Sequence, residues 1–476
     1  MNWMTTVRAR WTLVVLVSVS LAAAAFALTS CGSANDTPPN IVLVVLDTVR
    51  DDFAGAHVPG RPDELTPHLN ALASEGTTFI NTWSNAPWTV PSHASLFTGQ
   101  LPSTHRCTGH NWHFAYSGAT LAERLRVGGY RTMAFFSNPW LSDRLTGLMR
   151  GFDEQYVDPG IFGKAFHTAS QGGPETVGVI DGWLDRKDDD RPFMMFVNIL
   201  EAHLPYAPSR SYRDAFLPEM DPSYAVTSGL ADSVNAGLKD WEDVDWESVR
   251  RMYAGDVCYA DSLLGALVKV LRTHDLYDDT VIIVTSDHGE LIGEHGFLEH
   301  QFGVYEELLA VPLIIRAPGR LEPGTRSDPT MLSDLYATVL DLAGLAPEVE
   351  PRLSRSLLGA PAPEDRPVVA EYAGPSMAVR AKLHALAPEL EAPYLTTAYL
   401  TVRVSGLRLI LGSDGSQVLE DLSEIPLPRD ELARRGSELA ATLRQFMPKP
   451  VRAAPSERLR PDHSLEESLR SLGYVN

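Results

Sequence analysis

Cysteine is scarce in this chain, with three residues in 476. Cys31 lies near the N-terminus, which leaves Cys107 and Cys258 for the rest of the protein. The length is sufficient for one large domain and a smaller one, so core size is not limiting. In an exported protein the two later cysteines could pair, but two small buried residues without chemistry are an equal alternative.

Basic residues are outnumbered, with 40 Lys and Arg against 61 Asp and Glu and a formal net charge of −21. Arg8 and Arg10 are the only charges among the first thirty residues, so the rest of the chain carries −23, from 38 basic and 61 acidic residues. Such an acidic body argues against general binding to nucleic acid. It does not exclude an anionic substrate, because a metal ion and a few cations reverse the field inside one pocket.

Long apolar runs are absent apart from one near the N-terminus, WTLVVLVSVSLAAAAFAL, which follows the two early arginines and leads to LTSC. This order is typical of an export signal, and the cysteine after Leu-Thr-Ser resembles a bacterial lipobox, in which Cys31 would be lipidated. An uncleaved membrane anchor and plain secretion are the alternatives. We expect a lipoprotein-type signal over 1–30, a tether over 31–38, and a lipid-anchored protein of the bacterial cell envelope, on the periplasmic or extracellular side.

Several short segments have the apolar, β-branched character of strands buried on both faces. They span residues 40–47, 191–200, 280–287 and 311–318, with a weaker example at 129–137. Helical segments alternate with them, and the periodicity from Trp246 to Leu271 indicates a long amphipathic helix. Strands alternating with helices predict an α/β fold with a large, mainly parallel sheet flanked by helices.

The pattern changes after about residue 345. A segment rich in proline and charge is followed by an apparent β-hairpin that turns at Ser405-Gly406, and then by a helical segment over 429–446. These elements indicate a small α+β subdomain. The expected limits are 39–345 for the large domain, 346–450 for the subdomain, and 451–476 for a tail with a short terminal helix.

Two of the apolar strands end in an acid, Asp47 and Asp287, and His288 follows the second. In open α/β sheets, ligands gather at the carboxyl ends of the strands. A lone aspartate there often caps the next turn. An adjacent aspartate and neutral histidine, however, offer an oxygen and an imidazole nitrogen to one divalent cation, so this pattern favours a metal site.

Four stretches resemble the sulfatase family, within the alkaline phosphatase superfamily, and occur in the order that family shows. They are IVLVVLDTVRDD, APWTVPSHASLFTG, NILEAHLPY and TSDHGELIGEHGFLEHQFGVYEELLAVPLIIRAPG. The resemblance covers residues 38 to 450 and implies an alkaline-phosphatase-like sandwich and a metal-dependent hydrolase of phosphoric or sulfuric esters. It further implies that Asp47, Thr89, Asp287 and His288 bind metal, that Thr89 is the nucleophile, and that His203 and His300 act on the substrate's anionic group.

The chain also departs from the family. Sulfatases oxidise a Cys or Ser in a C/S-x-P-x-R pattern to formylglycine, whereas this chain has Thr89-Val90-Pro91-Ser92-His93. Neither Cys107 nor Cys258 begins such a pattern, so no formylglycine is expected. His93 replaces the arginine, Thr48 replaces the second aspartate of an Asp-Asp pair, and Asn138 is the one obvious polar candidate in FFSNPWL, where relatives have GKWH.

Four further residues are candidates for contact with the substrate, and two of them have an open alternative. His93 and Asn138 are candidates for substrate binding. Arg50 is a third candidate, although a surface or structural salt bridge explains it equally well. His203 would without the resemblance be equally well explained as a satisfied loop histidine.

Thr89 has two compatible interpretations. A threonine hydroxyl becomes a nucleophile when a metal lowers its pKa, and a phosphothreonine can be hydrolysed by water. A sulfothreonine lacks the aldehyde route of escape, which favours phosphoryl over sulfuryl chemistry. Alternatively, Thr89 is the N-cap of the following helix, whose positive end would then face the same anion.

The ligand set of three oxygens and one nitrogen favours Zn²⁺ or Mn²⁺ over Ca²⁺. A second metal would draw on His300, His295, Glu201 and His203. We expect Glu290, Glu294 and His295 to belong to a solvated loop. The aromatic residues of the loops 100–120 and 205–245 either form a rim for substrate or only pack the loops: Trp112, Tyr116, Tyr206 and Tyr212.

The leading hypothesis is a lipid-anchored metal-dependent hydrolase in which metal-bound Thr89 cleaves phosphate mono- or diesters. A phosphoethanolamine-type transferase at the membrane surface is the second, although such enzymes usually carry several transmembrane helices. A true sulfatase is the third and is hard to reconcile with Thr89. A non-catalytic binding protein is disfavoured, because four compatible metal ligands survive.

Overall fold

The computed structural model describes residues 38–56, 63–157, 171–217, 219, 225–346, 353–422 and 427–446. The predicted signal, most of the tether and the terminal helix lie outside these ranges. The chain divides into two units after Pro38, and the architecture below belongs to the second. The predicted limits of the large domain and subdomain stay predictions.

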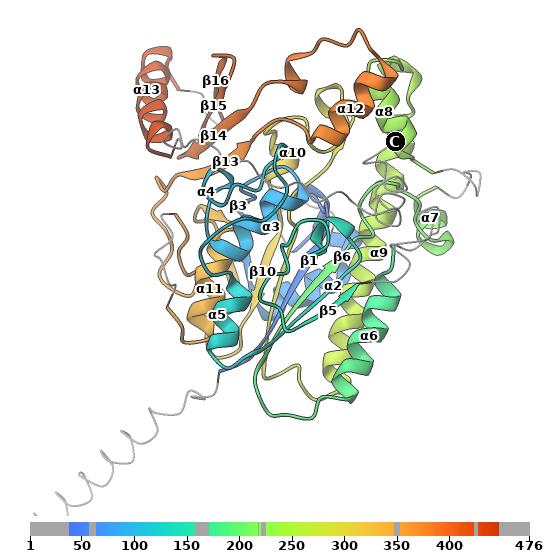
Figure 1. Ribbon diagram of the computed structural model, residues 1–476, viewed down its shortest axis with the longest axis vertical. Coiled ribbons are helices and arrows are strands. Elements are labelled where there is room, and N and C mark those ends of the chain that lie inside the picture. The colour runs from blue at the N-terminus through green and yellow to red at the C-terminus, as the bar shows by residue number, and fades with distance from the viewer. Residues whose placement is uncertain are drawn as a thin grey trace, which may run out of the picture. The chain divides into compact units, whose positions relative to one another are not determined.

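An eight-stranded sheet forms the centre of this unit (Figure 1). Its strand order is β11 (Gly324–Arg326), β2 (Thr77–Phe79), β10 (Leu313–Arg316), β7 (Thr280–Thr285), β1 (Asn40–Leu46), β6 (Phe193–Ile199), β4 (Arg131–Phe136) and β5 (Glu154–Val157). Strands β7, β1, β6, β4 and β5 are parallel, whereas β10 runs antiparallel to both of its neighbours. The sheet is therefore mixed and mostly parallel, as expected, with β10 as the exception.

Helices cover both faces of the sheet. Ile41, Leu43 and Val45 of β1 belong to the core cluster under α3 (Thr89–Thr98), α5 (Leu121–Val127) and α11 (Asp334–Leu342). Val42, Val44 and Leu46 belong to the opposite cluster, under α2 (Pro67–Glu75), α6 (Gly173–Asp185) and α9 (Trp246–Thr273). Because successive side chains of a strand face opposite sides, burial on both faces explains why the strand is apolar without interruption. Figure 1 shows α5 and α11 on one side of the sheet and α6 and α9 on the other.

A second, antiparallel sheet follows in the chain, in the order β13 (Val368–Tyr372), β14 (Tyr399–Val404), β15 (Leu407–Gly412) and β16 (Gln417–Asp421). Ser405 and Gly406 form the turn of the β14–β15 hairpin with φ of 46° and 78°. Both angles suit a two-residue hairpin turn. Helix α13 (Arg429–Phe446) packs on this sheet through Leu439 and Leu443, which confirms the predicted hairpin and helix.

Shorter elements connect these layers. They are η1 (Asp51–Phe53), η2 (Asp63–Leu65), β3 (Thr82–Trp83), α4 (Pro102–His105), η3 (Pro139–Leu141), α7 (Arg210–Phe216), α8 (Ser228–Asn235), η5 (Trp241–Asp243), β8 (Leu291–Ile292), η6 (Glu294–Gly296), β9 (Leu298–Glu299), α10 (Glu306–Leu309), β12 (Thr330–Met331), α12 (Met377–Leu386) and η7 (Pro393–Leu395). The hairpin β8–β9 follows β7 directly, and it leads from the end of the central sheet towards α10.

The two remaining cysteines are free thiols, Cys107 buried and Cys258 partly buried. Burial raises the pKa of both thiols, that of Cys258 to about 12, so neither is poised as a nucleophile. The alternative of two small residues without chemistry is therefore the one that the structure favours.

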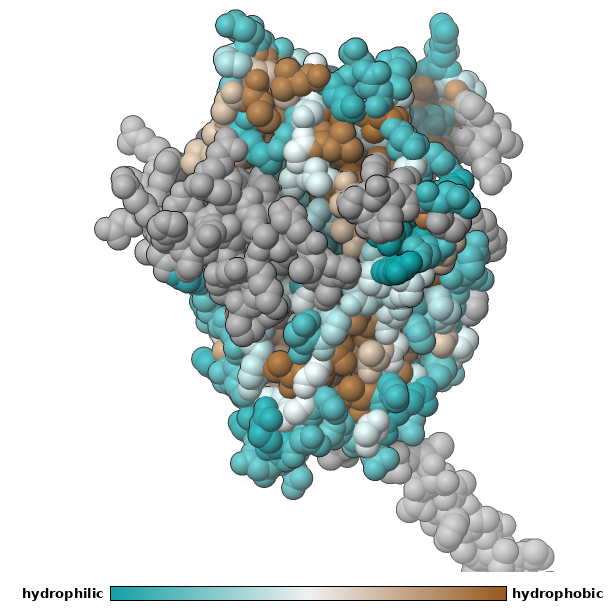
Figure 2. Space-filling model, turned by 90° about the vertical axis from the view of Figure 1, so that its right-hand side faces the viewer, coloured by the Kyte–Doolittle hydropathy of each residue, from teal (hydrophilic) through white to brown (hydrophobic). Residues whose placement is uncertain are grey.

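The face seen in Figure 2 mixes hydrophilic and hydrophobic residues, and its hydrophobic groups are interrupted by polar ones. The large apolar side chains that are exposed in the described ranges come from separate parts of the chain, and the most exposed of them is Val127, at 79%. Within those ranges, no helix is both long enough and apolar enough to cross a membrane.

Candidate metal centre and active site

The carboxyl ends of four neighbouring strands deliver polar side chains to one place. Asp47 follows β1, Asp287 and His288 follow β7, Asn198 lies near the end of β6, and Asn138 follows β4. These strands are adjacent in the order β7-β1-β6-β4, so residues up to 241 positions apart in the chain, Asp47 and His288, meet. The site therefore lies where parallel α/β sheets generally bind ligands.

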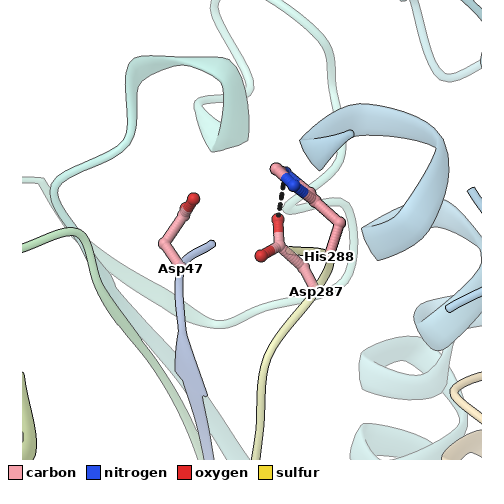
Figure 3. A group of neighbouring side chains, drawn as sticks. All are labelled: Asp47, Asp287 and His288. Carbon is pink, nitrogen blue, oxygen red and sulfur yellow. Dashed lines mark ion pairs between the residues drawn. The ribbon is translucent and has the colours of Figure 1, made fainter. Parts of the chain in front are cut away.

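Asp47, Asp287 and His288 form a buried group whose ligand atoms all lie within 4.8 Å of one another. Figure 3 shows Asp47 opposite the Asp287–His288 pair, in which Nε2 of His288 lies 3.3 Å from Oδ2 of Asp287. Oδ1 of Asp47 and Oδ2 of Asp287 have no hydrogen-bond partner among the described residues. Nδ1 of His288 donates to the carbonyl of Gly289 at 2.8 Å, which leaves Nε2 available as a ligand.

The protonation tendencies of these groups suit a cation. Burial and the neighbouring Asp47 carboxylate raise the pKa of Asp287, since two negative charges in a dry site repel each other. Burial lowers the pKa of His288, which keeps its imidazole neutral. A divalent cation is the partner that compensates both carboxylates and accepts a neutral imidazole, so the donor set fits a metal ion.

Two asparagines hold Asp47 in place. Asn138 and Asn198 each donate from Nδ2 to Oδ2 of Asp47 at 2.9 Å. Burial alone would raise the pKa of Asp47, but the neighbouring His203 and His288 and these two hydrogen bonds lower it. Asn138 also accepts from the Trp140 amide at 3.0 Å, so its contacts are those of a support for Asp47, whereas we predicted a contact with substrate.

Asn198 was missed from the sequence. It is the one polar residue in the strand FMMFVNI, and that interruption of an apolar strand is the signal that could have identified it. A buried amide in the central sheet requires a partner, and here the partner is Asp47.

Thr89 occupies the first position of α3, and Trp88 is the N-cap. The prediction that Thr89 might itself be the N-cap is wrong by one residue. No side chain caps this helix end, and the hydroxyl of Thr89 lies 3.4 Å from Nε2 of His288. The positive end of α3 and the Thr89 hydroxyl therefore face the same metal group, as an anion would require.

The following residues of α3 fix this placement. Ser92 donates from Oγ to the carbonyl of Asp287 at 2.7 Å, which ties the helix to the end of β7. His93 donates from Nδ1 to the carbonyl of Thr89 at 2.9 Å and lies 3.5 Å from Oδ2 of Asp287. Its ring packs against Phe196 in the core, and burial lowers its pKa. These contacts favour a supporting position behind Asp287 over the predicted contact with substrate.

Three histidines converge beside the metal group. The ring of His300 lies 4.5 Å from that of His288 and 5.2 Å from that of His203, measured between centroids. Nδ1 of His203 donates to the carbonyl of Leu204 at 2.6 Å. Burial lowers the pKa of His300, whose Nε2 has no hydrogen-bond partner within the described ranges. The structure thus brings both predicted catalytic histidines to the site.

Arg50 has a different environment. Its guanidinium makes two hydrogen bonds to Asp52, at 2.8 and 2.9 Å, and further bonds to Glu294 and to the carbonyl of Glu290. Only 3% of its side chain is exposed. The alternative of a structural salt bridge is therefore favoured over substrate binding.

The expectation of a solvated loop is wrong for two of its three residues. Glu290 is fully buried, and burial raises its pKa to about 8. Glu294 is 16% exposed and forms ion pairs with Arg50 and Arg250. Burial alone would raise the pKa of Glu294, but the charge of Arg50 outweighs this effect and the pKa is lowered to about 2. His295 is 39% exposed, stacks on Tyr305 and pairs with Glu307, as a solvated residue would.

Of the pool for a second metal, His203 and His300 lie beside the metal group, whereas Glu201 and His295 make other contacts. The carboxylate of Glu201 accepts from the amides of Gly173 and Gln171 at 2.7 and 3.2 Å, at the start of α6, and His295 lies on the surface. In the described part of the chain, no second group of three such ligands meets at one point.

The predicted aromatic rim is largely loop packing. Tyr206 is fully buried against Tyr253, and Trp112 packs edge-on against Trp140 at 5.6 Å. Tyr116 and Tyr212 are partly buried and contact Phe114 and Tyr259.

Comparisons with known proteins identify the family of the chain and proteins of similar fold. A protein-family model described as Sulfatase matches residues 39–345. The choline-sulfatase of Rhizobium meliloti is 29% identical over 65% of this chain and 68% of its own. The phosphonate monoester hydrolase of Agrobacterium radiobacter has a similar fold, with a TM-score of 0.66, 22% identity and coverage of 86% of this chain and 96% of that one. A protein solved with its substrate D-glucosamine-2-N,6-O-disulfate gives a TM-score of 0.68, 19% identity and coverage of 86% and 97%.

Proposed function

Because the chain belongs to the sulfatase family, within the alkaline phosphatase superfamily, and is a hydrolase, we propose that it cleaves phosphate mono- or diesters with Thr89 as nucleophile. The family supplies the class of reaction, which is transfer of a tetrahedral anionic group from an ester oxygen to water. Our proposal concerns the finer points, namely the phosphoryl group and the threonine.

The observation that carries the proposal is the placement of Thr89. Its hydroxyl lies at the first position of α3, 3.4 Å from Nε2 of His288. By the resemblance to the family, this is the position where a sulfatase carries its formylglycine precursor. Threonine does not fit the Cys or Ser pattern from which formylglycine is made. A plain hydroxyl favours phosphoryl transfer, because water hydrolyses a phosphothreonine.

Asp47, Asp287 and His288 would hold a divalent metal ion, with the hydroxyl of Thr89 beside them. A bound cation would lower the pKa of that hydroxyl and offset the charge of the transferred group. Zn²⁺ or Mn²⁺ suits this oxygen and nitrogen set better than Ca²⁺.

The chain's own groups supply the remaining stabilisation. The side chain of Trp88 does not cap the start of α3. Pro91 has no N–H and the Ser92 amide bonds to the Trp88 carbonyl, so the amides of Thr89 and Val90 are the ones that would meet oxygens of the transferred group. His203 and His300 lie beside the metal group, and we assign them to the charge that develops on that group.

The reaction would proceed in two steps. The Thr89 oxygen bonds to phosphorus while the ester P–O bond breaks, and the leaving oxygen takes up a proton. Water then attacks the phosphothreonine, releases phosphate or a phosphate monoester, and returns the hydroxyl to Thr89. Atoms and charge balance over the two steps without another co-reactant.

The test uses the metal-loaded protein with p-nitrophenyl phosphate, bis-p-nitrophenyl phosphate and p-nitrophenyl sulfate. Thr89→Ala is expected to abolish phosphoester turnover. Thr98→Ala is the matched control, because it also removes a buried threonine hydroxyl from α3. The hydroxyl of Thr98 donates to the Ala94 carbonyl. We expect that variant to keep its turnover.

Each outcome is informative. Phosphoester turnover that depends on Thr89 supports the proposal, and the ratio of monoester to diester turnover narrows the substrate class. Sulfate ester turnover that survives Thr89→Ala contradicts both the nucleophile and the phosphoryl assignment. Transfer of the phosphoryl group to an added alcohol in place of water would indicate a transferase.

We further infer that the protein works in the bacterial cell envelope, held by a lipid on Cys31. The support is the sequence alone, since this region lies outside the described residues. We expect the wild-type protein in the membrane fraction, from which detergent extracts it, and the Cys31→Ser variant in the soluble fraction. An unchanged distribution between the two fractions would contradict the anchor.

A further inference from the structure

A buried carboxyl–histidine pair lies beside the proposed site. Nδ1 of His300 and Oε1 of Glu290 share a hydrogen bond of 3.0 Å, and neither side chain has any exposed surface. The hairpin β8–β9 creates this pair, because Leu291 pairs with Glu299 and the next residues outward are Glu290 and His300. The register of two short strands therefore places the carboxyl opposite the ring.

The backbone around His300 is strained on both sides. Glu299 and Gln301 have φ of 85° and 76°, in the left-handed region that residues with side chains rarely adopt. Such conformations persist only where surrounding contacts hold them, and they cluster at functional sites. The strained backbone on both sides of His300 costs stability, and it fixes the position of this histidine.

The contacts that hold this segment come from the C-terminal part of the chain. Tyr372 of β13 donates from its hydroxyl to the Gln301 carbonyl, and the Ser376 amide donates to Oε1 of Gln301 at 3.1 Å. Gln301 is itself fully buried. His300 is therefore fixed by its own hairpin and by the second sheet together.

We propose that Glu290 is a positioning residue, which orients the ring of His300 so that Nε2 meets the substrate. The hydrogen bond to Glu290 occupies Nδ1, and Nε2 is the nitrogen without a partner within the described residues, next to the rings of His288 and His203. A ring held at one nitrogen presents the other in a fixed direction, as in a nucleophile–base–orienter arrangement. The inference rests on the proposed function, because it assigns the support of one of its catalytic residues.

The chain offers a matched control pair. His295 and Glu307 share the same residue types at 3.2 Å, but their side chains are 39% and 25% exposed. An exposed pair of this kind fixes little, because water competes for both partners. Glu307→Leu should therefore leave catalysis within about twofold of the wild type.

The test is a double-mutant cycle on kcat with the metal-loaded full chain. Glu290→Leu keeps much of the volume of the side chain but has no polar atom for Nδ1, and it is expected to lower kcat about 10- to 100-fold, as the loss of a supporting hydrogen bond does at comparable sites. In a His300→Ala background the same change should cost less than about twofold, because Glu290 would have nothing left to position. Equal losses in both backgrounds, with equal metal content, would overturn the proposal.

Histidine ¹⁵N NMR separates this inference from the proposed function, because it requires no turnover. The signal of His300 is assigned by its loss in His300→Ala. Glu290→Leu should shift its Nδ1 resonance, whereas Glu307→Leu should not, and an unchanged Nδ1 resonance in Glu290→Leu would overturn the positioning role. If the shift is found but the wild type cleaves no phosphoester, the proposed function fails while the pair stands.

Discussion

Asn198 offers the sharpest test of the metal site. Its Nδ2 donates to Oδ2 of Asp47 at 2.9 Å, and Asn138 donates to the same oxygen at the same distance. Asn198→Ala therefore removes half of the hydrogen-bond support of one ligand while leaving Asp47, Asp287 and His288 in the chain. A hydrogen bond to a charged group contributes about 1.5–3 kcal/mol.

That range sets the expected effect. If the bond orients the ligand for the cation, its loss weakens metal binding by about 10- to 150-fold, because each 1.4 kcal/mol is a factor of ten. The measurement is competition with a fluorescent chelator for Zn²⁺ and Mn²⁺, on wild type and variant. Asn138→Ala should give a loss of similar size, since its bond has the same length.

A control must separate metal binding from general loss of stability. Asn235 is also a buried asparagine, and it exchanges hydrogen bonds of 2.7 and 3.0 Å with the backbone of Leu298, away from Asp47. Asn235→Ala should lower the free energy of unfolding by about 1–3 kcal/mol and leave the metal affinity unchanged. An unchanged metal affinity in Asn198→Ala would refute our assignment of the centre, as would an equal loss in Asn235→Ala.

Three further predictions concern charge. Burial raises the pKa of Glu201 from 4.5 to about 7. The contribution of this group to the free energy of unfolding is therefore complete below about pH 4.5 and is lost as the pH rises through about 7. In urea unfolding, Glu201→Gln should remove a pH dependence of roughly 3 kcal/mol. Arg50→Ala leaves Glu294 with Arg250 as its remaining ion-pair partner and should lower the unfolding free energy by about 1.5–3 kcal/mol with little change in KM. A raised KM at intact stability would instead indicate that Arg50 binds substrate. Removal of the metal by a chelator should lower the melting temperature of the protein, because a cation at a hundredfold excess over its Kd stabilises the folded state by about 2.7 kcal/mol. Asp287→Asn should abolish the difference in melting temperature with and without chelator.

Patterns along the chain were sufficient for much of the fold. The strands β1, β6 and β7 were predictable because burial on both faces requires continuous apolar residues, which no solvent-facing segment shows. The turn at Ser405-Gly406 and the bounds of α13 follow from local backbone and periodicity rules. The direction of β10 was not predictable in the same way, because an apolar strand has the same composition whichever way it runs.

The residues of the site likewise fall into those that the sequence identifies and those that only the structure identifies. The adjacent Asp287 and His288 at a strand end, and Thr89 as a candidate nucleophile, could be identified from the sequence because each signal is carried by neighbours in the chain. The partners of Asn138, Asn198 and Glu290 could not, because each partner is brought close by sheet order or hairpin register. Only the tertiary structure decides whether a carboxyl such as Glu290 faces water or a buried histidine, since burial depends on what packs over it and leaves no mark on the residue itself.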